Sequence, residues 1–431
     1  MAKRILAVLL IFLMLLGVAA CGEFEQPTGD TTPITDNNGT ESATDRTDVT
    51  TAKEDKTTKK NDNTPTPTPA KDDSIFTSEE KVIDIYLIAG QSNAVGYTKI
   101  ADQAAAYAWA PELENGFSNV LFAGKTRWDW GSSYDSQDYQ WQKATLALGA
   151  YYSIDPRIGP DAGMAKALSE YYNEESGKVA GMIKFGHGGT SLLTIVDSST
   201  TGSNRFGTWV SPSYAKSLGM SDATYQSGKT GALYREFLEV VREKLTALVA
   251  EGYTNVNIMG LYWMQGENDR FYPNEYKTAF KCFASDLRSD LSEMLMDLTG
   301  ADDRGASQMP IFVGTISQTF NLASASAETI NWDFITMQKS LPDQVNNCYV
   351  VDNSKYRISQ YNPSEPGNPI ITGLGSDQWH WNQADHLAIG NNVGRAILLH
   401  YRYIESEKKG LTAEETGEAM VTDVLNGNDE T

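Results

Sequence analysis

The chain has 431 residues, of which 56 are Asp or Glu and 35 are Lys or Arg, so its formal net charge is −21. This excess of acid disfavours nucleic acid as a partner, because phosphate binding depends on clustered basic side chains. Three cysteines are too few for a disulfide framework, and no internal apolar stretch reaches the roughly 20 residues that cross a bilayer. These counts exclude a disulfide-stapled domain and a polytopic membrane protein.

Residues 1–20 have the pattern of a secretory signal peptide. Lys3 and Arg4 precede an apolar run over 5–16, and small residues then lead to Cys21. The tetrapeptide VAAC that ends at Cys21 resembles the lipobox of bacterial lipoproteins, in which the cysteine carries a lipid anchor after cleavage. We therefore expect a lipid-anchored, extracytoplasmic protein at the bacterial cell surface. An ordinary secretory signal with a chance cysteine is the alternative.

Residues 21–75 differ abruptly in composition from the rest of the chain and are predicted to be a disordered stalk. The segment is rich in Thr, Asp, Asn and Lys, has Phe24 as its one aromatic residue, and includes TPTPTP at 64–69. Such a chain buries too little apolar surface to offset the entropy of ordering it. The folded domain is expected over 76–407, followed by a flexible acidic tail over 408–431.

Apolar runs alternate with amphipathic stretches of helical periodicity in the folded part. The patterns predict strands over 82–88, 179–185, 256–264, 311–316 and 349–351. They predict helices over 162–172, 234–250, 274–295, 327–341 and 384–403. Strand and helix in alternation indicate an α/β fold with a parallel sheet and helices on both faces, because parallel strands need long crossover connections.

Four polar segments that contain glycine or flank a helix start are expected to meet at one edge of this sheet. In such folds, ligands bind outside the carboxyl ends of the strands. The segments are AGQSNAVG at 89–96, GHGGTS at 186–191, WMQGEND at 263–269 and DQWHWN at 377–382. Their convergence predicts the functional site.

A serine at a strand end can act as a nucleophile if a base lies beside it, and the chain has four histidines. His400 lies in an apolar stretch and His386 on the first turn of the last predicted helix, so both are expected to be structural. His187 follows a strand and is a candidate substrate contact. His380 follows Asp377 by three residues, close enough for one ring nitrogen to bond the carboxylate while the other faces a serine. Such pairs also occur by chance.

These residues carry a resemblance to the SGNH hydrolases, and most closely to the sialate O-acetylesterase-like branch, carbohydrate esterase family 6, which includes acetylxylan esterases. The matching blocks are Gly90-Gln91-Ser92-Asn93, the turn at 188–190, Gln265-Gly266-Glu267 with Asp269, Asp377-x-x-His380, and Gly159-Pro160-Asp161. The similarity covers about 81–403. It implies a flavodoxin-like, three-layer α/β/α sandwich with a central, mostly parallel five-stranded sheet, and removal of acetyl groups from sugars.

By this resemblance Ser92 is the nucleophile, His380 the base and Asp377 the acid that orients it. The oxyanion hole is expected to use the Ser92 amide, a glycine amide and the side chain of Gln265, which replaces the Asn of most SGNH enzymes. The glycine is either Gly188 or Gly189. No metal or other cofactor is expected, since no His or Cys cluster has ligand spacing. Cys282 and Cys348 either pair or stay reduced.

The expected partner is an acetylated oligosaccharide or polysaccharide. Candidate substrate contacts are Gln91, Asn93, His187, Glu267, Trp379 and Trp381, although buttressing of the loop is favoured for Glu267 and Asp269. The aromatic residues Trp128, Trp130, Tyr134, Tyr139 and Trp141 either stack on sugar or pack an irregular loop. Acetylated xylan is the first expectation, O-acetyl sialic acid the second and another acetylated glycan such as peptidoglycan the third. A carbohydrate-binding lipoprotein without turnover is the alternative from another class.

Overall fold

The computed structural model describes a single folded region that begins at the first predicted strand. The described residues are 81–130, 133–150, 156–194, 206–300, 303, 305–320, 326–355 and 379–409, without the side chains of 128–135, 327 and 402–409. The predicted signal peptide, the stalk, most of the acidic tail and Asp377 therefore lie outside the described residues.

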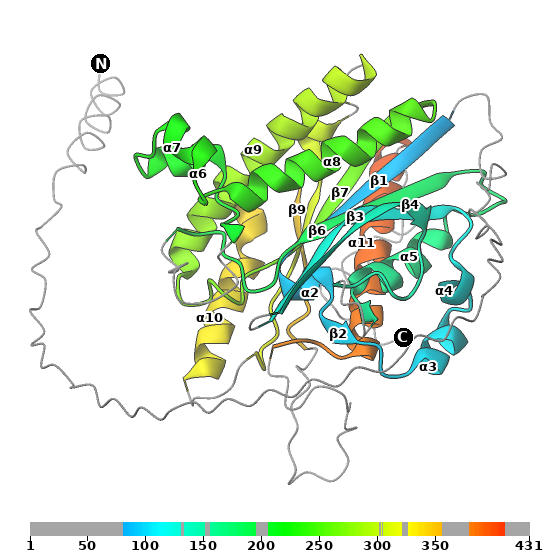
Figure 1. The fold of residues 1–431 in the computed structure, drawn as a ribbon, viewed down its shortest axis with the longest axis horizontal. Helices are drawn as coiled ribbons and strands as arrows, with labels where there is room; N and C mark the ends of the chain where they lie inside the picture. The colour runs from blue at the N-terminus through cyan, green and yellow to red at the C-terminus, as the bar shows by residue number, and fades with distance from the viewer. Residues whose placement is uncertain are drawn as a thin grey trace, which may run out of the picture. The chain divides into compact units, whose positions relative to one another are not determined.

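A mixed, mostly parallel sheet forms the centre of the domain, with the strand order β4-β3-β6-β1-β7-β8-β9 (Figure 1). Its strands are β1 (Lys81–Gly90), β3 (Val120–Trp130), β4 (Ser133–Lys143), β6 (Val179–Gly186), β7 (Tyr253–Met264), β8 (Ile311–Gly314) and β9 (Cys348–Val351). Every neighbouring pair is parallel except β3 with β4. The strands β2 (Thr98–Lys99) and β5 (Arg157–Ile158) form a separate antiparallel pair. The predicted α/β class is confirmed, and each of the five predicted strands is present.

Two strands that the sequence did not predict, β3 and β4, extend the five-stranded sheet to seven. The aromatic residues of this hairpin are the ones expected either to stack on sugar or to pack an irregular loop. On β4, Tyr139 packs edge-on against Phe122, with ring centroids 5.5 Å apart, and Trp141 donates its indole N–H to the Lys244 carbonyl at 2.9 Å. Both side chains therefore contribute to packing rather than to a sugar platform.

Helices cover both faces of the sheet, as expected for a three-layer fold (Figure 1). On one face, α5 (Pro160–Ser169) packs against α11 (Gln383–Lys409), and on the other lie α8 (Ala232–Ala250) and α9 (Pro273–Thr299), with α10 (Ala327–Lys339) against α9. The shorter helical elements are α2 (Ser92–Val95), α3 (Gln103–Trp109), α4 (Glu112–Asn115), α6 (Pro212–Ser217), α7 (Asp222–Ser227), η3 (Ala306–Gln308) and η4 (Leu341–Asp343). The long helices match the amphipathic stretches predicted from the sequence to within four residues at each end, except that α11 continues to Lys409 rather than ending at 403.

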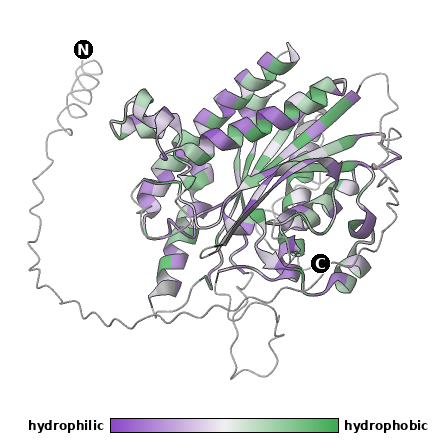
Figure 2. Cartoon of the chain, viewed as in Figure 1, coloured by the Kyte–Doolittle hydropathy of each residue, from purple (hydrophilic) through white to green (hydrophobic). Residues whose placement is uncertain are grey.

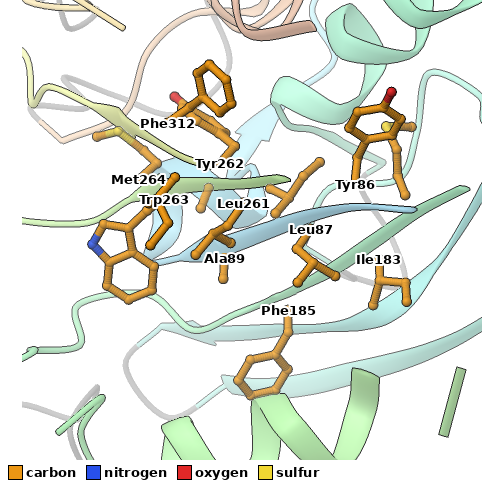
Figure 3. Close-up of a cluster of buried hydrophobic side chains, with 14 of the residues drawn as sticks. Tyr86, Leu87, Ala89, Ile183, Phe185, Leu261, Tyr262, Trp263, Met264 and Phe312 are labelled. Carbon is orange, nitrogen blue, oxygen red and sulfur yellow. The ribbon is translucent and has the colours of Figure 1, made fainter. Parts of the chain in front are cut away.

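Alternate side chains of each central strand enter different layers. On β6, Phe185 stacks on Phe237 of α8, whereas the next residue back, Lys184, contacts Asp161 of α5. The central strands are rich in apolar residues, because helices cover both faces of the sheet. Figure 2 shows the apolar residues along these strands in green. Figure 3 shows the resulting core, with side chains such as Tyr86 and Trp263 fully buried on the central strands.

Cys282 and Cys348 are both free thiols. Cys348 is buried on β9, and this burial raises the pKa of its thiol to about 12. A thiol with so high a pKa is almost wholly protonated at neutral pH and therefore a poor nucleophile. Within the described ranges, no helix combines the length and apolar character needed to cross a bilayer.

The contact between α5 and α11 depends on glycine. A Cβ built at Gly390 would lie 1.8 Å from the Pro160 carbonyl oxygen. We expect Gly390→Ala to lower the free energy of unfolding by about 1–3 kcal/mol, because the two helices must move apart to make room for the methyl group. Helix propensity alone would favour alanine by about 1 kcal/mol, so a loss measured by urea unfolding reports the contact.

The matched control for this prediction is Gly260→Ala on β7. A Cβ at Gly260 would make ordinary contact, 3.4 Å from the Pro310 carbonyl oxygen. This variant should unfold close to wild type. Equal stability of the two alanine variants would contradict the close approach of α5 and α11.

Candidate active site

Three of the four predicted segments follow neighbouring strands and meet at one edge of the sheet. β6, β1 and β7 are adjacent and parallel, and Gly90 at the end of β1 is paired with Gly186 on one side and Met264 on the other. The fourth segment, which contains His380, lies just before α11 and contacts Asn93, the residue after Ser92. The predicted convergence is confirmed for the described residues of these segments, which for the fourth segment begin at Trp379.

Ser92 begins the short helix α2 directly after a sharp turn at the end of β1. Gly90 has φ 143°, and a Cβ there would lie 2.0 Å from the Met264 carbonyl oxygen, so glycine is required. The Gln91 amide donates to the same oxygen at 3.0 Å, and the Gly96 amide closes the turn on the Ser92 carbonyl at 2.8 Å. The serine is thus held on a tight strand–turn–helix unit.

Asn93 links the serine segment to the histidine segment. Its side-chain nitrogen donates to Glu267 Oε1 at 2.7 Å and to the Trp379 carbonyl at 3.1 Å, and its oxygen accepts from the Trp381 amide at 3.4 Å. The two peptide groups that it binds lie on either side of His380. Asn93 therefore fixes the predicted base relative to the predicted nucleophile, while its contact with substrate stays a prediction.

Further groups support the histidine segment. The His380 ring lies 5.5 Å from the Tyr97 ring, and the Thr98 hydroxyl donates to the Trp381 carbonyl at 2.5 Å. At the start of α11, the Asp385 amide donates to Asn382 Oδ1 at 2.8 Å, so the Asn382 side chain caps this helix. Neither Tyr97 nor Thr98 stood out in the sequence, because only tertiary packing brings them to this segment.

The remaining histidines have different surroundings. His400 lies between Tyr349 and Phe312, and burial lowers its pKa to about 4, in agreement with the predicted structural role. His386 is buried beside Trp381. His187 is also buried, with its ring 4.6 Å from Phe206, so this structure does not present its side chain to solvent.

Gln265 and Asp269 join the loops that follow β6 and β7. The Gln265 amide nitrogen donates to Asp269 Oδ2 at 2.7 Å and to the Thr190 carbonyl at 3.0 Å. Asp269 also accepts from the Ser191 hydroxyl and from the Leu192 amide, the latter at 2.9 Å. Asp269 thus buttresses the two loops, as the sequence favoured. Because the Gln265 nitrogen is already engaged, its role as an oxyanion donor stays a prediction that requires reorientation.

The predicted glycine donors lie on the adjacent loop. The Gly188 amide donates to the Tyr97 phenol oxygen at 3.2 Å, which places this amide close to the ring that contacts His380. An oxyanion at Gly188 would have to replace the phenol as the acceptor. The choice between Gly188 and Gly189 stays open.

Two buried carboxyl groups shape the electrostatics of the site. Burial raises the pKa of Glu267 from 4.5 to about 7, although the hydrogen bond from Asn93 and the proximity of His380 and Arg270 oppose the shift. Burial likewise raises the pKa of Asp269 to about 6. Burial therefore favours the protonated, uncharged form of both carboxyl groups relative to exposed Asp and Glu side chains.

Comparison with known proteins agrees with this geometry. A family model described as carbohydrate esterase, sialic acid-specific acetylesterase, matches residues 82–398, from β1 into α11. The chain belongs to this carbohydrate esterase family. It is a carboxylic ester hydrolase, a carbohydrate acetylesterase, which places it among enzymes rather than binding proteins without turnover.

Several solved structures are similar to this esterase at low sequence identity. NanS has 17% identity and a TM-score of 0.45, with 76% of this chain and 100% of that chain covered. A carbohydrate acetylesterase from Xanthomonas citri has 14% identity and a TM-score of 0.38, covering 74% of this chain and 56% of that one. An acetylxylan esterase from Geobacillus stearothermophilus has 11% identity and a TM-score of 0.29, covering 74% and 95%. No curated protein sequence matches the chain.

The raised pKa of Glu267 predicts a pH-dependent stability. Between pH 4.5 and about 7 the folded esterase keeps a proton on Glu267 that the unfolded chain has released, so the free energy of unfolding should fall as pH rises. Glu267→Gln removes this titration and should make the slope less steep, as measured by urea unfolding across that range, while Asp269, whose pKa is also raised, still contributes. Loss of one titrating carboxyl group changes this slope by at most about 1.4 kcal/mol per pH unit.

Glu239→Gln is the control, because Glu239 is exposed on α8 and its loss removes a carboxyl group that already lies in water. It should reproduce the wild-type pH dependence. A Glu267→Gln variant with the full wild-type slope would show that another group is responsible.

Proposed function

We propose that this esterase hydrolyses acetyl esters of carbohydrate through an acyl-enzyme on Ser92. His380 accepts the proton of the serine hydroxyl as its oxygen attacks the ester carbonyl, and then passes that proton to the departing sugar oxygen, which leaves as a free hydroxyl. Water repeats the attack and releases acetate. Asp377 is proposed to orient the imidazole. The observation that carries the proposal is the Asn93 bridge, which binds the peptide groups on both sides of His380.

The tetrahedral intermediate needs hydrogen-bond donors on its oxyanion. The proposed donors are the Ser92 amide, the amide of Gly188 or Gly189, and the Gln265 side chain. In the described arrangement the Gly188 and Gln265 donors bind internal acceptors, so substrate binding must exchange these acceptors for the oxyanion.

The proposed substrate is an acetylated neutral glycan, with acetylated xylan as the first candidate. A protein with a net charge of −21 repels anionic polymers, which favours xylan over sialylated chains. The second candidate is an O-acetylated sialic acid, which the description of the matching family favours. Both substrates carry the same ester, so the two candidates differ in the sugar rather than in the chemistry.

A lipid-anchored position outside the cytoplasm is part of the proposal. The lipobox-like tetrapeptide ends at Cys21, and the stalk over 21–75 would let the domain reach polymer near the membrane. A flexible coil of that length spans on the order of 40 Å.

The proposed nucleophile and base can be tested by acetate release from an aryl acetate. Ser92→Ala and His380→Ala should each lower kcat by at least about 10³-fold, and the double variant should be hardly worse, because the two residues act as a unit. His386→Ala and His400→Ala should keep kcat within about tenfold. An active, folded His380→Ala enzyme would overturn the assignment of the base.

The substrate is tested with the same enzymes on a panel of natural esters. We expect kcat/KM for acetylated xylan to exceed that for O-acetyl sialic acid and acetylated peptidoglycan by at least about tenfold, a difference of about 1.4 kcal/mol in transition-state binding. Ser92→Ala serves as the blank for each ester. A preference for O-acetyl sialic acid would transfer the assignment to the second candidate.

The anchor is tested by phase partitioning of the full chain expressed in bacteria. Wild type should enter the detergent phase, and Cys21→Ala should remain in the aqueous phase because it has no thiol to carry the lipid. Cys282→Ala is the control and should partition like wild type. Unchanged partitioning of Cys21→Ala would exclude the anchor.

A further inference from the structure

A buried ammonium group lies beneath the helix that carries Ser92. Lys184 of β6 is fully buried, as is its partner Asp161 at the start of α5, and their charged atoms are 2.5 Å apart. The same ammonium donates to the Val95 carbonyl at 2.9 Å and to the Leu148 carbonyl. All three of its donors are therefore used. Lysine is almost never fully buried, and its pairing with Asp161 explains how the charge is tolerated here but not what the buried pair contributes.

The Val95 carbonyl is the significant acceptor, because Val95 is the last residue of α2. Carbonyls in the last turn of a helix have no partner within the helix and are stabilised by a cationic donor. The opposite end of the same unit is fixed by the Gln91 amide on the Met264 carbonyl. The turn that carries Ser92 is thus held at its start by β7 and at its end by Lys184.

Neighbouring groups make this attachment rigid. Arg157, also buried, donates to the Tyr97 carbonyl at 2.9 Å, two residues beyond Val95. A Cβ at Gly159 would lie 2.6 Å from Asp161 Oδ1 and 2.8 Å from the Val95 carbonyl oxygen, so backbone, carboxylate and ammonium are packed without space between them. The Lys184 ammonium thus links the end of α2 to both β6 and α5.

We propose that Lys184 is a positioning residue for Ser92, and that Asp161 holds its ammonium group against the Val95 carbonyl. The proposal rests on the proposed function, in which Ser92 is the nucleophile. A buried ion pair is weak evidence for stability, since well-packed apolar residues often replace such pairs at no cost. Its value here lies in fixing the serine hydroxyl within reach of His380.

Lys184→Met tests the proposal, because methionine keeps much of the side-chain volume and removes the donor. We expect kcat to fall about 10²-fold with KM within about threefold, since a small displacement of a reacting group has an effect of this size. The rate at which a fluorophosphonate labels Ser92 should fall by a similar factor, because labelling depends on the same serine geometry.

Lys244→Met is the matched control. Lys244 on α8 is equally inaccessible, with 1% side-chain exposure, and pairs with Asp138 at 2.5 Å and Glu243 at 2.9 Å. It lies on α8, on the opposite face of the sheet from α5, and neither Asp138 nor Glu243 belongs to the site. Its loss should lower the melting temperature and leave kcat and labelling unchanged.

The double variant Lys184→Met, Asp161→Leu separates positioning from folding. Lys184→Met alone leaves an unpaired buried carboxylate, which is strongly destabilising, whereas the double variant leaves no charge. We expect the double variant to regain melting temperature while kcat stays about 10² below wild type. Recovery of kcat together with stability would overturn the proposal, as would wild-type kcat in folded Lys184→Met. A double variant that fails to fold also counts against it, because the pair would then be a requirement of the fold.

Ser92→Ala distinguishes this test from a failure of the proposed function. If Ser92→Ala is inactive while Lys184→Met is fully active, Ser92 remains assigned as the nucleophile and the positioning role of Lys184 is disproved. If Ser92→Ala retains activity, the nucleophile assignment falls and this proposal falls with it.

Discussion

The parallel pairing of β6, β1 and β7 is the constraint on which the site depends. Because the three strands run in the same direction in register, Gly90, Gly186 and Met264 end side by side, and each following loop starts at the same edge. The turn at Gly90 then folds back so closely on β7 that no side chain fits. The pairing of the strands therefore suffices to bring together the serine, the glycine loop and the Gln265 loop. The histidine segment follows none of these strands and reaches the site from the start of α11.

Buried polar groups connect these loops to one another and fix their relative orientation. Asn93 joins the serine and histidine segments, Asp269 joins the loops after β6 and β7, and Lys184 joins α2 to α5. Hydrogen bonds between buried groups are directional, so they fix relative orientation in a way that dispersion contacts do not. The cost is visible in the carboxyl groups, since burial raises the pKa of both Glu267 and Asp269.

The sequence allowed the central strands and the long helices to be predicted, because residues such as those of β1 and α8 follow one clear periodicity. The hairpin of β3 and β4 was missed because the polar, aromatic residues of β4 do not show the pattern of a buried strand. The convergence of the motif segments was also predictable, since it follows from topology. The contributions of Tyr97, Thr98 and Lys184 were not, because their partners are distant in sequence and no residue type or spacing marks them.

The strand order has a further consequence for association between molecules. In the described sheet the outermost strands are β4 and β9, and an unpaired strand edge is a template for pairing with another chain. β9 has only four residues, and β4 has the polar sequence SYDSQDYQWQK with two aspartates. A short edge and a hydrophilic edge both oppose amyloid-like growth, so the hairpin that widens the sheet also protects the folded domain from edge-to-edge aggregation at high concentration.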